Sequence, residues 1–170
     1  MSAVIIDIKP ARVIKESVFE EVENIAKKDA PDGTSYEQVT AVEEDSHLLT
    51  QYWRDSLQQL AIFLADYYVS IGEAKDEDVL DVPGVTVPLV LDLPNNWNSG
   101  MLMNLENAVN GYIASYIKSR WFRNVKKDDE SVYLKDCDRF VSEARNICCA
   151  RVRPKKVTRE CMCNENNDMP

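Results

Sequence analysis

Much of this chain repeats apolar side chains every three or four residues, the spacing that places them on one side of an α-helix. The longest stripe contains Leu49, Tyr52, Trp53, Leu57, Leu60, Leu64, Tyr67 and Ile71. A second contains Leu102, Leu105, Val109, Tyr112 and Tyr116, flanked by Ile113, Ile117 and Trp121. A third contains Tyr133, Cys137, Phe140, Val141, Ala144 and Cys148. A shorter stripe after Pro10 contains Ile14, Val18, Val22 and Ile25. These stripes predict a mainly α, four-helix bundle-like domain with extended termini.

The expected helix ends follow from capping residues. Asp45 or Ser46 is expected to cap the second helix, and Gly72 to end it. Asn98 or Ser99 is expected to cap the third helix, and Pro154 limits the fourth.

One short region, residues 85–93, follows a different period. Val85, Val87, Leu89, Leu91 and Leu93 alternate with other residues, which predicts a β-strand or hairpin with one buried face. Pro88 cannot donate a backbone hydrogen bond, so we expect an edge strand or one arm of a hairpin. Its partner is the short N-terminal strand near residues 4–8, its own first half folded back, or a neighbouring subunit. These five apolar residues are therefore candidates for a strand contact between subunits.

The chain's 170 residues suit a single domain over 1–157, with an N-terminal strand and arm at about 1–10 and a polar C-terminal tail over 158–170. No apolar run approaches the roughly 20 residues that a membrane-spanning helix needs.

No export signal precedes the five cysteines, so reduced thiols are expected, with Cys137 and Cys148 packed as small core residues. Cys161 and Cys163 lack the further ligands that a zinc site requires, so no metal or other cofactor is predicted.

Catalytic patterns are not found in the sequence. His47 is the only histidine, and it has no nucleophile motif near it. The five glycines are dispersed, so no phosphate-binding loop is formed. We therefore predict a non-enzyme with no catalytic or cofactor-binding residues.

Charge is distributed unevenly along the chain, whose formal net charge is −9. Residues 1–117 contain 7 basic and 20 acidic side chains, whereas residues 118–159 contain 13 basic and 6 acidic ones. The densest basic stretch contains Arg151, Arg153, Lys155, Lys156 and Arg159. This stretch is a solvated helix end, a docking arm for an acidic face of an identical or different protein, or a nucleic-acid contact. An acidic body beside a basic end favours head-to-tail contact between copies, which generates rings when the rotation closes.

The second half of the chain resembles a known class of proteins. The resemblance covers residues 45–157 and includes the strand ending in Leu91-Asp-Leu-Pro-Asn-Asn-Trp-Asn, the helix with Arg120-Trp-Phe, and the ending Arg151-Val-Arg-Pro-Lys. These features are similar to head–tail adaptor or connector proteins of tailed phages and prophages of gut anaerobes. The acidic stretch over residues 73–81 and the cysteine-bearing tail depart from that pattern.

The resemblance implies a non-enzymatic virion structural protein made in the bacterial cytoplasm and located at the head–tail interface. It implies a homo-oligomeric ring that contacts the portal protein and a tail component, with DNA passing through without sequence-specific binding, and no membrane contact. One alternative is a small acidic regulatory or inhibitor protein that binds a host protein. A second alternative is a nucleic-acid-binding protein that uses the basic C-terminal segment.

Overall fold

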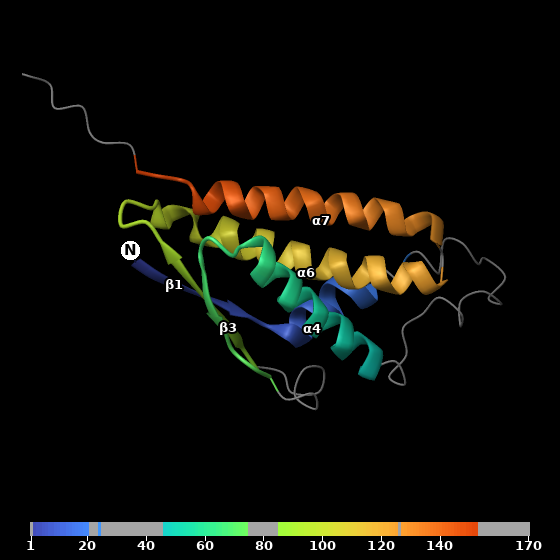
Figure 1. The fold of residues 1–170 in the computed structure, drawn as a ribbon. Helices are drawn as coiled ribbons and strands as arrows, with labels where there is room; N and C mark the ends of the chain where they lie inside the picture. Colours follow the sequence, from blue (N-terminus) through green and yellow to red (C-terminus); the bar gives the residue numbers. More distant parts are fainter. Residues whose placement is uncertain (1, 21–23, 25–45, 75–84, 126, 153–170) are drawn as a thin grey trace, which may run out of the picture.

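A computed structural model describes residues 2–20, 24, 46–74, 85–125 and 127–152 of the chain (Figure 1). The described part is mainly helical and contains one three-stranded antiparallel sheet. The principal helices are α4 (Ser46–Phe63), α6 (Leu102–Val125) and α7 (Lys127–Cys148). A helical segment near the N-terminus consists of α1 (Pro10–Arg12) followed by the π-helical η1 (Val13–Phe19). The prediction of a mainly helical domain with a short β region is confirmed.

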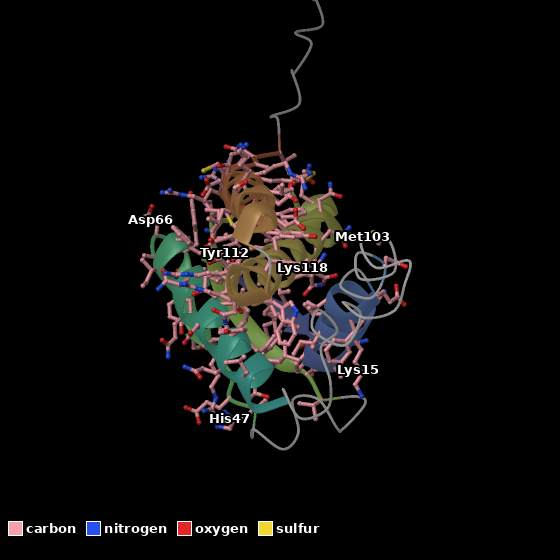
Figure 2. All side chains as sticks on the ribbon, turned by 90° about the vertical axis from the view of Figure 1, so that its right-hand side faces the viewer. Lys15, His47, Asp66, Met103, Tyr112 and Lys118 are labelled. Atoms are coloured by element: carbon pink, nitrogen blue, oxygen red, sulfur yellow. The ribbon has the colours of Figure 1, made fainter. Side chains whose placement is uncertain are left out.

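Helix α6 lies at the centre of the molecule. It pairs with α7 over much of its length and also contacts α4, η1 and β1. Residues 112–119 of α6 are all buried, including the polar Ser115, Lys118 and Ser119, so every side of this part of the helix is covered by other parts of the chain. In Figure 2, the labelled Tyr112 and Lys118 lie near the centre of the molecule, where α6 is enclosed by its neighbours.

Close packing between α6 and α7 depends on a glycine. A Cβ atom at Gly111 would lie 2.6 Å from the ring of Phe140. Elsewhere along the pair, Phe122 of α6 stacks on Tyr133 of α7, with ring centroids 5.2 Å apart. The two helices follow one another closely in the sequence, and this short separation makes them antiparallel neighbours.

The sheet has the strand order β1–β3–β2, so β3 is its central strand. β1 (Ser2–Ile8) pairs with β3 (Val87–Leu93) from Ser2 opposite Leu93 to Ile8 opposite Val87. β2 (Tyr68–Ile71) pairs with the other side of β3 and contains an irregularity between Tyr68 and Ser70. The predicted N-terminal strand is confirmed. Three pairing partners were considered for the strand in residues 85–93, and the N-terminal strand is the one of these that pairs with it.

The prediction that one helix continues to Ile71 is wrong, because α4 ends at Phe63. The amides of Tyr67 and Tyr68 donate to the carbonyl of Leu64, so the chain turns there. The next residues, Tyr-Val-Ser-Ile, favour strands and find hydrogen-bond partners along β3. Pairing with a distant segment therefore overrides the helical spacing of Tyr67 and Ile71.

The prediction of an edge strand from Pro88 is also wrong. The carbonyl of Pro88 accepts a hydrogen bond from the amide of Gly72 at 2.8 Å, and Gly72 lies just beyond the end of β2. In an antiparallel pair, the N–H and C=O of one residue face the same neighbour. The missing N–H of Pro88 therefore faces the end of the β2 ladder, where its absence costs little.

Gly72 has a different role from the predicted helix cap. A Cβ atom at this position would lie 2.6 Å from Cδ and 2.9 Å from Cγ of Pro88. The proline ring therefore occupies the space that any other side chain would need. Gly72 allows the chain leaving β2 to pass directly against β3.

Candidate interaction surface

The sheet has a buried side and an exposed side. On the buried side, Ile6 and Ile8 of β1 and the alternate residues of β3 are fully enclosed in the core. The exposed side, which we call the outer sheet face, consists of side chains from all three strands: Ala3, Ile5, Asp7, Val69, Ser70, Pro88, Val90 and Asp92. The helices α6 and α7 lie together on one side of the strands in Figure 1.

The outer sheet face exposes apolar side chains in its centre. Ile5 is 58% exposed and Val69 is 54% exposed, and half-buried Val90 lies opposite Ile5 in the register. The only charged side chains on the three strands are Asp7 and Asp92. The outer sheet face therefore has an apolar centre with one acidic side chain toward each end.

β1 contributes an edge to the same region. Its pairing with β3 uses one side of the strand, and no described residue pairs with the other side. The strand contains neither lysine nor proline, the residues that natural proteins place on edges to prevent pairing. The outer sheet face and this edge are therefore adjacent surfaces to which another polypeptide can bind.

The residues predicted to form a strand contact between subunits lie elsewhere. Val87, Leu89, Leu91 and Leu93 are fully buried in the core, and Val85 is half-buried just before β3. The prediction that these side chains meet a partner is therefore wrong for the four residues within β3. The apolar face of β3 is buried in the hydrophobic core, so only its other face remains exposed.

Arg151 is the one predicted docking residue inside the described part of the chain. Its Nη1 donates to the carbonyl of Cys148 at 3.3 Å, at the C-terminal end of α7. It also forms an antiparallel bridge with Trp97. A cation at this helix end is the arrangement expected of a C-terminal cap. Arg153, Lys155, Lys156 and Arg159 lie outside the described residues.

The segment after α7 is held against the loop that follows β3. The amide of Val152 donates to the carbonyl of Asn96 at 2.9 Å, and the amide of Asn98 donates to the carbonyl of Ala150 at 3.2 Å. The indole Nε1 of Trp97 donates to the carbonyl of Ile147 at 2.8 Å. These bonds hold residues 150–152, the last described residues of the chain, against the loop after β3. In Figure 1, α7 ends on the side where the label N marks the start of β1.

A polar pocket with a volume of 290 Å³ lies where β1 leads into α1 beside α6. Its lining is mostly charged or amide side chains: Asp7, Lys9, Arg12, Val13, Glu106, Asn107 and Asn110. Asn110 Oδ1 is buried without a hydrogen-bond partner. The pocket wall contains both acidic side chains (Asp7 and Glu106) and basic ones (Lys9 and Arg12), so it favours neither an anionic nor a cationic ligand. The pocket therefore identifies no ligand class.

The structure also places the predicted cysteines and histidine. Cys137 and Cys148 are buried in the core, as predicted, and burial raises the pKa of Cys137 to about 12 and that of Cys148 to about 11. His47 is exposed near the start of α4 (Figure 2). Within the described residues, no group of three or more histidine, cysteine or acidic side chains is arranged to hold a metal ion.

The sequence reasoning missed the outer sheet face because it missed β2. The available signal was the run of β-favouring residues Tyr68-Val-Ser-Ile, which overlaps the last position, Ile71, of a helical stripe. The acidic residues Asp7 and Asp92 gave no separate signal, because their proximity depends on the pairing of two distant strands.

The chain matches no protein-family model, no curated protein and no solved structure. None of the helices in the described ranges is long and apolar enough to cross a membrane. A function for this protein therefore has to be inferred from its surfaces and its sequence.

Proposed function

We propose that this protein is a non-enzymatic structural subunit that assembles with other polypeptides, specifically a head–tail adaptor of a tailed phage or prophage. Its subunits would form a ring between the portal and the tail, located in the virion after synthesis in the bacterial cytoplasm. DNA would pass through the ring without sequence-specific binding.

The observation that carries this proposal is the outer sheet face beside an unpaired strand edge. Ile5 and Val69 are each more than half exposed, and both belong to one continuous sheet. Burying such apolar side chains against another protein gains hydrophobic free energy, and a strand edge adds directional hydrogen bonds. These are properties of a protein that binds proteins.

The helical body suits the same role. We infer a four-helix bundle-like arrangement around α6, because α7, α4 and η1 all contact that helix. A body with a buried central helix provides a rigid support for surfaces at the ends of the strands and for the chain termini. The acidic net charge of −9 is suited to a channel through which DNA must slide without adhering.

The test is to mix the purified full-length chain with rings of the portal protein encoded nearest to it, and to image the product by electron microscopy. We expect an additional ring on the tail-facing end of the portal. A chain that remains a separate monomer in the presence of portal rings would refute the proposal. An unrelated acidic helical protein of similar mass serves as the control.

A further inference from the structure

We propose that the outer sheet face is the docking site for the C-terminal segment, residues 153–159, of a second copy of this chain. This inference rests on the proposed function and deepens it, because it names the contact that links neighbouring subunits.

The outer sheet face contains three rows of side chains that cross the strands. At one end Asp7 lies opposite Pro88, in the middle Ile5 lies opposite Val90, and at the other end Ala3 lies opposite Asp92. Positions 88 and 92 are four residues apart, a distance of about 14 Å along a strand. The surface therefore has acidic ends separated by an apolar middle.

The C-terminal segment has a complementary order of side chains. Its sequence is Arg153-Pro-Lys-Lys-Val-Thr-Arg159, with no acidic residue. In an extended conformation, alternate residues project to the same side, so Lys155, Val157 and Arg159 share one side. The two cations are then also about 14 Å apart, with the valine between them.

These two patterns match in both charge and spacing. With the segment lying along β3, Lys155 and Arg159 would each reach one of the two aspartates, while Val157 would cover Ile5 and Val90. Exposed ion pairs contribute little binding free energy, so the apolar contact supplies affinity and the charges fix the register. The strands themselves contain no lysine or arginine, and Lys9 and Arg12, which line the polar pocket with Asp7, are the cations with which the segment would compete for that aspartate.

The acidic body and the basic end of the chain favour a second copy as the source of the segment, because opposite charges at the two ends of a subunit favour head-to-tail contact between copies. Residues 150–152 run antiparallel to residues 96–98 and lead toward the end of β3. Both sides of β3 are already occupied by β1 and β2, so the segment cannot continue as a further strand beside it. A segment from one subunit on the outer sheet face of the next is a head-to-tail contact, which generates a ring when the rotation between subunits closes.

The experiment compares full-length variants by sedimentation velocity over a range of protein concentrations at low salt. D7N/D92N removes the charges of the outer sheet face, and K155Q/R159Q removes those of the segment. D138N/E143Q is a matched control that removes two exposed carboxylates from α7. We expect the wild type and the control to associate, and both test variants to associate about two- to thirtyfold more weakly, toward the 19.4 kDa monomer, because each removes two exposed ion pairs.

Two further measurements identify the contact. The variant D7K/D92K/K155E/R159E exchanges the charges, and we expect it to associate as the wild type does. An equal mixture of D7N/D92N with K155Q/R159Q has one functional face and one functional segment for each pair of chains. It should therefore stop at a species of two chains.

Association of both neutral variants at the wild-type level would overturn the inference, and so would a wild type that stays monomeric at every concentration. The latter is also the result expected if the segment binds the face of its own subunit. Either result leaves the portal-binding experiment as an independent test. A wild type that self-associates as expected but never joins portal rings would instead refute the proposed function alone.

Discussion

Replacing Gly72 with alanine tests how β2 and β3 meet. The added Cβ would lie 2.6 Å from Cδ of Pro88, whereas carbon atoms in favourable contact are about 3.5–4.0 Å apart. Either the proline ring or the chain leaving β2 must therefore move by about 1 Å. Overpacking of this kind costs about 1–3 kcal/mol, and replacing a glycine returns up to about 1 kcal/mol through backbone entropy. We expect Gly72→Ala to lower the free energy of unfolding by about 1–2 kcal/mol.

The assay is urea and thermal unfolding followed by circular dichroism. For a chain of this size, the expected loss corresponds to a decrease in Tm of about 2–8 °C. Ser70→Ala, an exposed change in the same strand, is the control and should alter stability by less than about 0.5 kcal/mol.

A double-mutant cycle with Pro88→Ala isolates the contact. In the Pro88→Ala background, the ring atoms are absent and the nearest remaining atom to the added Cβ is the backbone nitrogen of residue 88, at 3.4 Å. Gly72→Ala should then be neutral or stabilising, which gives a coupling free energy of about 1–2 kcal/mol. Equal destabilisation in both backgrounds, or a stabilising effect in the wild type, would refute the steric explanation.

Three other changes test separate parts of the fold. Leu91→Ala should lower the free energy of unfolding by about 2–5 kcal/mol in urea denaturation, because this side chain is fully buried; a loss below about 1 kcal/mol would contradict its placement in the core. Trp97→Phe removes the hydrogen bond to the carbonyl of Ile147 and should cost about 0.5–1.5 kcal/mol in the same assay, whereas an unchanged stability would show that the bond contributes nothing. Burial raises the pKa of the Cys137 and Cys148 thiols, so the folded state binds protons that the unfolded state releases above about pH 9. Stability measured against pH should therefore fall from about pH 9 toward 11 or 12, and less steeply in a C137A/C148A variant; an equal slope in that variant would assign the loss to other groups.

Local sequence determined the parts of this protein that depend on neighbours a few residues away. The apolar spacing in α6 and α7 identifies those helices, and the cap predicted near Asn98 is present, since its side chain accepts a hydrogen bond from the amide of Gly100. The alternation over residues 85–93 identifies β3 and its buried side chains. These features follow from the periods of the helix and the strand, which any segment expresses in its own sequence.

Tertiary structure alone decided which strands pair and what remains exposed. Ile71 continues the helical spacing of Leu64 and Tyr67, yet the residues from Tyr68 to Ile71 become β2 because β3 offers hydrogen-bond partners that no local pattern reveals. Pro88 takes a central position because the ladder of β2 ends beside it. Asp7 and Asp92 come to border one apolar surface only because residues more than 80 positions apart are paired in register. Contacts over such separations depend on the path of the whole chain, and the order of residues within a single segment does not determine that path.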